Sequence, residues 1–200
     1  MSEAQNSTVV WQAQELVNFP GAVIEGEVGV VPSSQGAVLE FDGQSDGLVL
    51  PINPIAGWTK FTVEVIFRPD QGGLPEQRFL HIGQCHGERL LFETRVVPEG
   101  TWYLDTFLSS AGGSCTLMNK GFHHPLGEWY HAALTFDGSR LTNSVNGQSE
   151  LSEVLKFTPI EGGETSIGMR QNKVSWYKGL IGTIRATARD LDPTEFLPLM

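Results

Sequence analysis

One stretch, residues 127–147, restricts the fold of this chain more than any other. Residues 129–136 are rich in aromatic, β-branched and other apolar side chains that suit a pleated strand, and Asp137-Gly138 follows directly. A second segment runs from Arg140 to Val145 and ends at Asn146-Gly147. Such Asx-Gly pairs are strong hairpin signals, because glycine tolerates a positive φ. The stretch therefore predicts an antiparallel meander, with a strand of about six to eight residues between two tight turns.

The rest of the chain repeats this pattern of short apolar segments separated by glycine and proline. Residues 61–68 are the clearest example, because Phe61, Val63, Val65 and Phe67 would lie on one face of a strand. Further strands are expected at residues 9–11, 23–28, 36–41, 48–50, 78–83, 90–97, 101–109, 115–118, 164–169 and 180–188. About twelve short strands with frequent turn signals predict an all-β fold, a two-sheet antiparallel sandwich of jelly-roll type.

The ends of the chain are less regular. Residues 1–8 are polar and are expected to form a mobile lead before the first edge strand. Residues 15–19 fit either a short strand or a turn of helix, and Asp192-Pro193 fits the N-cap and first position of a short helical turn. No repeat or linker divides the chain, so a single domain over residues 1–200 is predicted.

Composition argues against several classes of protein. The formal net charge of −10 disfavours a nucleic-acid partner, because phosphate backbones are also negative. No apolar run approaches the roughly 18 residues of a membrane-spanning helix, so membrane insertion is not expected. The first eight residues lack the features of a secretory signal, which predicts a cytoplasmic protein unless a leader has been removed. Cys85 and Cys115 are expected to be two separate thiols.

Four segments together resemble a known family. They are Leu39–Asp46, Phe61–Pro69, Gly127–Gly147, and Ser166–Gly168 with Gly179–Gly182. In this order they resemble the laminin-G-like domains of the concanavalin A-like lectin/glucanase superfamily, over roughly residues 36–190. The resemblance implies a jelly-roll sandwich whose concave face, in relatives, often holds carbohydrate. The superfamily also includes glycosidases, polysaccharide lyases and adhesion modules, so the fold alone does not choose a function.

The resemblance also raises the question of a structural calcium ion. Asp42 and Asp46 could supply oxygen ligands to it, together with backbone carbonyls and water. The alternative is that Asp42 only shapes the Asp42-Gly43 turn. Relatives commonly carry an acidic pair in the last strand, where an Asp helps to hold calcium, but this chain has Gly182-Thr183 there. That departure counts against an inherited calcium site.

A sugar-binding site requires aromatic surface next to amide, carboxylate and guanidinium groups, because a sugar ring has an apolar face and a polar edge. The residues selected as ligand-binding on this basis are Arg95, Tyr103, Asp105, Arg170 and Trp176. Phe61, Phe67, Trp129 and Phe136 are expected in the core, and Trp102 is compatible with either place.

Catalytic patterns are weaker. A retaining glucanase of this superfamily would carry two carboxylates spaced by two on one strand, and no such motif exists here because Glu64, Glu93 and Asp105 are isolated on their strands. A lyase would place Arg, His and Tyr on adjoining strands, which Arg95, His131 and Tyr103 could provide. His131, however, is more typical of a hydrogen-bonded structural residue. No residue is therefore predicted to be catalytic.

Three functions remain open at this point. The first is a non-catalytic module that binds carbohydrate on its concave face or rim loops. The second is a diverged polysaccharide lyase or glycoside hydrolase. The third is a domain that binds a protein ligand or associates with itself through an edge strand such as Val9-Val10-Trp11.

Overall fold

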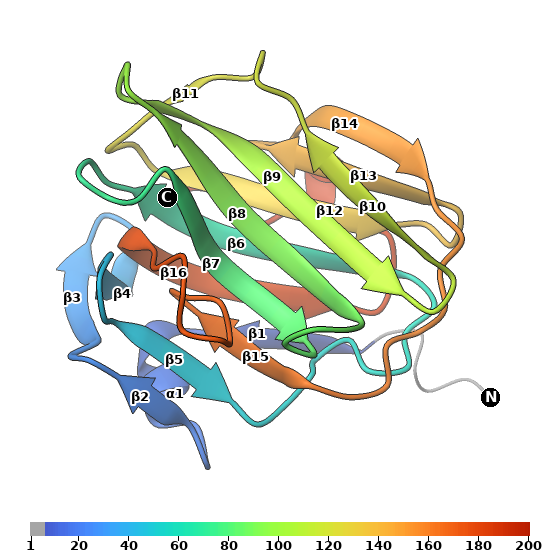
Figure 1. The fold of residues 1–200 in the computed structure, drawn as a ribbon, viewed down its shortest axis with the longest axis horizontal. Helices are drawn as coiled ribbons and strands as arrows, with labels where there is room; N and C mark the ends of the chain where they lie inside the picture. The colour runs from blue at the N-terminus through green and yellow to red at the C-terminus, as the bar shows by residue number, and fades with distance from the viewer. Residues whose placement is uncertain (1–6) are drawn as a thin grey trace.

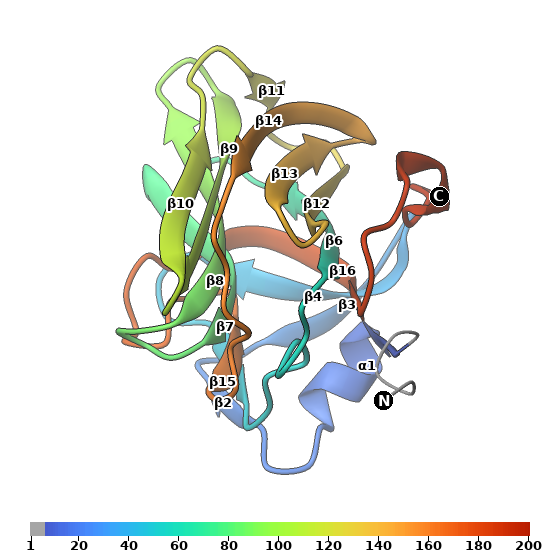
Figure 2. The ribbon, with the colours of Figure 1, turned by 90° about the vertical axis from the view of Figure 1, so that its right-hand side faces the viewer.

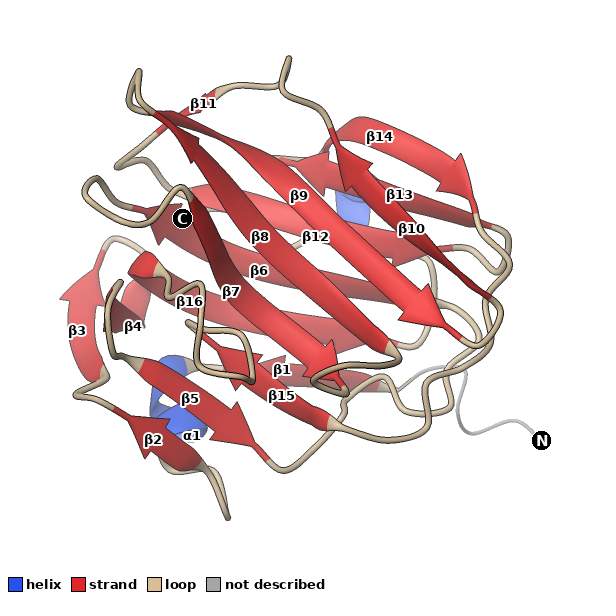
Figure 3. Ribbon diagram, viewed as in Figure 1, coloured by secondary structure: helices blue, strands red, loops and turns tan. Residues whose placement is uncertain are grey.

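The computed structural model describes residues 7–200, which form two antiparallel β-sheets packed face to face (Figure 1). Figure 2 shows the two sheets as separate layers, and Figure 3 shows how little regular structure lies outside them. The all-β, two-sheet jelly-roll architecture expected from the turn pattern is confirmed. The described residues contain sixteen strands instead of about twelve, because several loops carry strands of only two to five residues.

Each sheet contains eight strands. Sheet A contains, in spatial order, β14 (Gln148–Val154), β13 (Arg140–Val145), β12 (Tyr130–Phe136), β6 (Phe61–Pro69), β16 (Lys178–Thr187), β4 (Gly36–Asp42) and β3 (Gly29–Ser33), with β1 (Thr8–Trp11) pairing with β16. Sheet B contains β10 (Gly113–Met118), β9 (Thr101–Ser110), β8 (Arg89–Val97), β7 (Glu76–Gly83), β15 (Glu164–Ile167), β5 (Gly47–Leu50) and β2 (Val23–Glu25), with β11 (His124–Pro125) pairing with β9. Helix α1 (Ala13–Val17) and the 3-10 turn η2 (Pro193–Glu195) lie outside the sheets. Within residues 7–200, neither these nor any other helix has the length and apolarity to cross a membrane.

The predicted meander is present in sheet A. Strands β12, β13 and β14 pair in sequence, and Asp137-Gly138 connects the first two. Asn146 and Gly147 both have positive φ angles, of 50° and 76°, as the tight turn between β13 and β14 requires. The Asx-Gly pairs therefore predicted this part of the topology correctly.

Trp129 is a correction to the sequence analysis. The structure places it just before β12, half-buried, with the Arg68 guanidinium 5.9 Å from its ring centroid. Its neighbour Tyr130 belongs to the core cluster instead, together with Ala132 and the residues that alternate with it. Because successive side chains of a strand point to opposite faces, Tyr130 in the core leaves Trp129 outside it.

The core lies between the two sheets and is rich in aromatic side chains. Phe67 of β6 stacks on Phe79 of β7 with ring centroids 4.3 Å apart, and Trp102 of β9 meets Phe67 edge-on at 5.2 Å. The predicted core positions Phe61, Phe67 and Phe136 are buried. Trp102 is fully buried as well, so of its two predicted places the core is the correct one.

The C-terminal segment, residues 191–200, covers part of the outer face of sheet A (Figure 2). Beneath it, Glu64 is fully buried and accepts hydrogen bonds from Arg185 Nε at 2.5 Å and the Leu197 backbone N–H at 2.8 Å. His131 Nε2 lies 3.0 Å from the same carboxylate. His131 is therefore a buried, hydrogen-bonded residue, as the structural interpretation of the sequence predicted.

The ends of the chain differ in part from expectation. Thr8 already belongs to β1, so the predicted mobile lead is wrong at this residue, and residues 1–6 lie outside the described part of the chain. The ambiguous residues 15–19 overlap helix α1. Asp192 accepts a hydrogen bond from the Thr194 backbone N–H and caps η2, as predicted.

The two cysteines are separate free thiols. Cys85 lies in the turn between β7 and β8, and Cys115 lies on β10 with its side chain against the core. Burial raises the pKa of the Cys115 thiol, which keeps it in the unreactive protonated form.

Candidate functional site

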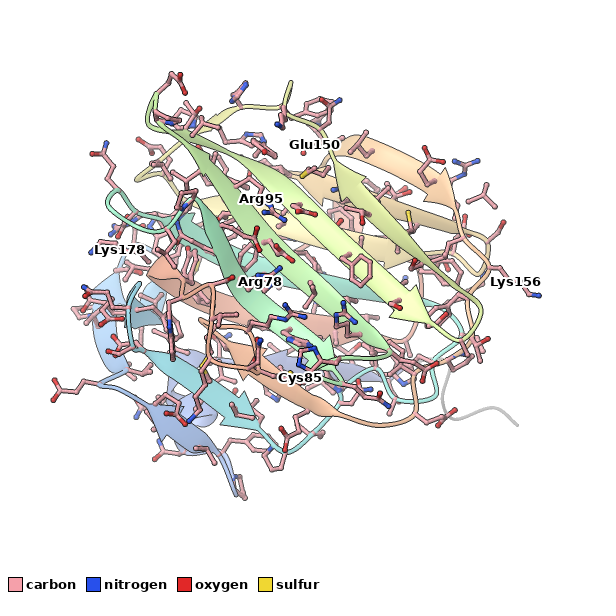
Figure 4. All side chains as sticks on the ribbon, viewed as in Figure 1. Arg78, Cys85, Arg95, Glu150, Lys156 and Lys178 are labelled. Atoms are coloured by element: carbon pink, nitrogen blue, oxygen red, sulfur yellow. The ribbon has the colours of Figure 1, made fainter. Side chains whose placement is uncertain are left out.

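The outer face of sheet B carries a regular row of polar side chains. On β8, the alternating residues Arg89, Leu91, Glu93 and Arg95 point away from the core, because Leu90 and its alternating partners fill the inside. Strand β9 pairs with β8 so that Ser109, Phe107, Asp105 and Tyr103 lie opposite these four residues, respectively. Figure 4 shows Arg78 of β7 and Arg95 of β8 on this face.

A hollow of about 210 Å³ lies on this face, and we call it the arginine hollow. It is lined by four arginines (Arg78, Arg89, Arg95 and Arg170), two carboxylates (Glu93 and Asp105), and the side chains of Leu91, Phe107 and Thr116. The arginines come from β7, β8 and the loop between β15 and β16, so three separate parts of the chain build it.

Two of the arginines are paired with carboxylates. Arg95 contacts Asp105 through Nη2 at 2.6 Å and Nε at 2.8 Å, and its Nη2 also lies 3.2 Å from Glu93. Arg78 lies 3.0 Å from Glu93 through Nε and 2.7 Å from Glu76 through Nη1. Glu76 also pairs with Arg95. These five groups form one continuous ion-pair network along β7, β8 and β9.

Burial dominates the ionisation of the carboxylates inside this network. It raises the pKa of Glu93 to about 7, although Arg78 and Arg95 oppose the change. Burial also raises the pKa of Asp105 against the pull of Arg95. Glu76 is more exposed, so the two arginines outweigh its burial and lower its pKa. The innermost carboxylate of the network is thus only partly ionised near neutral pH.

The other two arginines have no carboxylate partner. Among residues 7–200, no carboxylate oxygen lies within 4.0 Å of Arg89 or Arg170. The Nε atom of each of these two arginines is buried and has no hydrogen-bond acceptor among the described residues. Arg89 instead stacks over Phe107, with its guanidinium carbon 4.8 Å from the ring centroid, and donates to the Gly87 carbonyl at 2.7 Å. Burial and repulsion from Arg170 and Arg78 lower the pKa of Arg89.

The loop that carries Arg170 is held firmly against sheet B. Gln171 donates through Nε2 to the carbonyls of Gly83 and Glu164, both at 3.0 Å. At the far end of the loop, the Arg78 N–H donates to the Ser175 carbonyl at 2.8 Å. The Arg170 side chain is therefore positioned over the hollow by bonds to β7 and β15.

The residues predicted to bind a ligand are only partly brought together. Arg95, Asp105 and Arg170 line the arginine hollow. Tyr103 lies beside them, directly opposite Arg95 on the same face, but is outside the hollow. Trp176 is half-buried in the β15–β16 loop and does not line it.

Sequence reasoning missed Arg78, Arg89, Glu93 and Phe107 as members of this site. Glu93 is the only carboxylate on β8, as the sequence indicated, but the sequence did not show that Asp105 of the neighbouring strand β9 lies directly opposite it. The alternation of Arg89, Glu93 and Arg95 along β8 was a visible signal for one shared face.

The lyase-like group Arg95, Tyr103 and His131 is not assembled. Arg95 and Tyr103 are neighbours on the outer face of sheet B, whereas His131 belongs to sheet A and lies beneath the C-terminal segment. The structure therefore contradicts the interpretation that these three residues act at one site.

Asp42 and Asp46 lie together at the turn between β4 and β5. Asp42 Oδ1 accepts hydrogen bonds from the backbone N–H groups of Gln44, Ser45 and Asp46, and these outweigh the effect of burial and lower the pKa of Asp42 to about 2. Asp46 accepts from the N–H groups of Glu27 and Asp42. These bonds match the turn-shaping alternative, and a calcium ion would have to compete with the N–H donors.

Across residues 7–200, no group of three or more His, Cys, Asp or Glu is arranged to hold a metal ion. Calcium binding stays a prediction.

Comparisons with known proteins agree with the fold. A family described as the concanavalin A-like lectin/glucanases superfamily matches residues 42–195. No curated protein matches the sequence.

Three solved structures illustrate the range of similar proteins. Domain 4 of AbnA, a GH43 extracellular arabinanase from Geobacillus stearothermophilus in complex with arabinotriose, is 19% identical with a TM-score of 0.65, covering 96% of this chain and 97% of that domain. A heptameric SAP-like pentraxin from Limulus polyphemus is 17% identical with a TM-score of 0.63, covering 82% and 81%. The binding domain of botulinum neurotoxin DC, in complex with SialylT, is 12% identical with a TM-score of 0.65, covering 87% of this chain and 44% of that one. At these identities the likeness concerns the fold alone.

Proposed function

Because the chain belongs to the concanavalin A-like lectin/glucanases superfamily, we propose that it is a non-catalytic module that binds carbohydrate on the outer face of sheet B. The observation that carries this proposal is the arginine hollow. It presents charged groups of both signs around Leu91 and Phe107, the mixture that the polar edge and apolar face of a sugar ring require. The arabinotriose complex of the AbnA domain, which matches this chain over almost its whole length, supports the same kind of ligand.

The position of the hollow supports binding on sheet B in preference to sheet A. On sheet A, the C-terminal segment covers Glu64 and His131. On sheet B, the hollow faces solvent between strands that are held rigidly by pairing on both sides. A rigid strand surface costs little ordering entropy on binding, which favours affinity for a flexible sugar.

A non-catalytic role is supported by the state of the two carboxylates. Glu93 and Asp105 are almost completely buried and both contact Arg95. A glycosidase needs one carboxyl group free to donate a proton and the other free to attack the sugar or activate water. Carboxylates engaged in this way serve better to orient the arginines than to react.

One observation favours a second candidate, a glycoside hydrolase. The pKa of Glu93, about 7, is that of a general acid at neutral pH, and Asp105 lies directly opposite. Incubation with pooled polysaccharides would decide the matter. Turnover by the native chain that is lost in Glu93→Gln would support the enzyme, and the absence of any turnover would remove it.

The binding proposal is tested with a blocked variant. Thr116 is exposed on β10 and lines the hollow, so Thr116→Trp should fill it without disturbing the core. The control is Val154→Trp, because Val154 is 65% exposed on β14 of sheet A. Both variants and the native chain are screened by thermal shift against an oligosaccharide panel, with calcium and with a chelator.

A ligand at 100 times its dissociation constant should stabilise the native chain by about 2.7 kcal/mol. We expect this shift to vanish in Thr116→Trp and to persist in Val154→Trp. Equal binding by Thr116→Trp would show that the site lies elsewhere. If no oligosaccharide of the panel shifts the melting temperature of the native chain, a protein ligand would be favoured instead. A shift that requires calcium would support the calcium site at Asp42 and Asp46.

A further inference from the structure

The arginines of the hollow are not equivalent, and the difference indicates which kind of sugar fits. Arg78 and Arg95 are neutralised by Glu76, Glu93 and Asp105. Arg89 and Arg170 have no carboxylate within 4.0 Å among residues 7–200, which sets them apart, and each, like Arg78, also has a buried Nε without a hydrogen-bond acceptor. A buried donor left without a partner destabilises the folded chain, and more so when it is charged. Two guanidinium groups without a carboxylate partner at one hollow therefore favour a ligand that brings anionic acceptors, although Arg89 also donates to the Gly87 carbonyl.

The charge balance of the hollow leads to the same conclusion. Its lining contains four arginines but only two carboxylates, in a chain whose formal net charge is −10. Repulsion from Arg170 and Arg78 acts on Arg89 and, together with burial, lowers its pKa. The same arginines, added to the dominant effect of burial, help to lower the pKa of the neighbouring His81 to about 4, so His81 stays neutral. A bound anion would relieve this repulsion.

The size and floor of the hollow limit the ligand to a small unit. Its volume of about 210 Å³ is below the roughly 300–1,000 Å³ of typical small-molecule sites, so it suits one sugar ring. Leu91 and Phe107 provide apolar contact for the face of that ring. Guanidinium groups bind carboxylate and sulfate oxygens in pairs, with fixed geometry and charge-assisted hydrogen bonds.

We infer that the arginine hollow binds an acidic sugar, with the carboxylate or sulfate ester of one ring held by Arg89 and Arg170. This inference rests on the proposed carbohydrate-binding function and names its substrate class. Arg95 and Asp105 then meet the hydroxyl groups of the same ring, as donor and acceptor. The ion-pair network of Arg78, Glu76 and Glu93 keeps Arg95 in place.

The test compares matched sugars. Native chain is titrated calorimetrically with uronic-acid oligosaccharides and with their carboxyl-reduced counterparts, and in a second arm with sulfated oligosaccharides and their desulfated counterparts. We expect the acidic member of at least one pair to bind about tenfold more tightly or better, since hydrogen bonds to charged groups are stronger than those to neutral groups. The arm that shows the difference identifies carboxylate or sulfate as the anion.

Variants then assign the effect to the two arginines. Arg89→Gln and Arg170→Gln each remove one positive charge, and Arg140→Gln is the matched control because Arg140 is exposed at the start of β13 in sheet A. Affinity for the acidic sugar should fall about tenfold or more in either hollow variant, should change less than about twofold in Arg140→Gln, and should not change for the neutral counterpart. Unchanged melting temperatures would show that the variants fold.

The outcomes separate this inference from the proposed function. Equal affinity for acidic and neutral members of every pair would overturn the inference while leaving carbohydrate binding intact. An equal loss in Arg140→Gln would mean that only the overall charge matters, which also overturns it. No binding to any sugar would overturn both proposals.

Discussion

At the scale of the residue, Glu93 stands out because its surroundings fully stabilise neither the charged nor the neutral form of its carboxyl group. It is almost completely buried at the centre of the ion-pair network, and its Oε2 has no hydrogen-bond donor among residues 7–200. Arg78 and Arg95 lie 3.0 and 3.2 Å away by their nearest nitrogens, but Asp105 and Glu76 add negative charge nearby. Burial and these like charges outweigh the arginines, which explains a pKa of about 7.

Stability should therefore depend on pH through Glu93. Its pKa is about 7 in the folded chain and 4.5 as the ordinary value, so its stabilising contribution is full below about pH 4.5 and is lost as the pH rises through 7. In Glu93→Gln this loss cannot occur. We expect the free energy of unfolding of the variant, measured with urea from pH 4.5 to 8, to gain up to about 3 kcal/mol relative to the native chain over that range.

The exposed carboxylate Glu128 provides the control for that experiment. Glu128→Gln removes the same charge outside the network, so its unfolding curve should run parallel to that of the native chain. If Glu93→Gln also ran parallel, Glu93 would titrate normally in the folded state and the account of its burial would be wrong.

At the scale of the element, the C-terminal segment acts as a cover for sheet A. The Leu197 N–H donates to buried Glu64 at 2.8 Å, the Phe196 ring packs 5.1 Å from the His131 ring, and Gln35 bonds to the backbone of Met200 at 2.7 and 3.1 Å. Without this cover, Glu64 would lose one of its donors and the imidazole of His131 would meet water. The segment thus completes a polar cluster that the strands alone leave unfinished.

Phe196→Ala should weaken this cover. Phe196 is only half-buried, so we expect a loss of about 1–2 kcal/mol in the free energy of unfolding, less than the roughly 3–5 kcal/mol of a fully buried Phe. Hydrogen exchange of the Leu197 amide should accelerate with it. Leu199→Ala, at a residue 39% exposed in the same segment, should change stability by less than about 0.5 kcal/mol. Equal effects of the two changes would show that the ring contact with His131 does not hold the segment.

Strand β8 shows how much of this molecule its sequence could predict. The alternation of Arg89, Glu93 and Arg95 with Leu90 and its neighbours is local, so strand and shared face could be predicted. The partners of those side chains could not. Asp105 faces Glu93 only because of the β8–β9 register, and a register shift between Arg78 and Leu80 aligns β7 with β8. Register depends on turns and bulges and on packing across the sheet, and single-strand patterns do not contain it.

Arg170 and His131 illustrate the same limit over longer distances. Arg170 reaches the hollow from a loop far along the chain, fixed by Gln171 bonding to Gly83 and Glu164. The alternation along its strand places His131 on the outer face, where a ligand-binding residue would also lie, but the C-terminal segment covers it. The local sequence therefore predicted the strands well and the site only in part.

At the scale of the whole molecule, the two outer faces have different roles. The C-terminal segment covers part of sheet A, and helix α1 packs against strands β4 and β16 of that sheet. Sheet B presents a hollow with more arginines than carboxylates on a chain of net charge −10. The arginine excess at the hollow attracts anions there, whereas the net negative charge of the chain opposes a long polyanion, so one small anionic ligand is favoured.

The same charge and the strand edges bear on self-association through β1. Strands β1 and β2 contain four and three residues, and β3 carries exposed Pro32, so these three strands offer little continuous backbone for pairing. We therefore expect sedimentation velocity to show a monomer of 21.9 kDa over a wide range of protein and salt concentrations. A dimer at high salt, where charge repulsion is screened, would contradict this.

If such a dimer formed, Val10→Lys would test the β1 edge, because Val10 is 44% exposed, and Val154→Lys on β14 would be the control. Dissociation by Val10→Lys alone would establish β1 as the interface and revive the interaction-domain function.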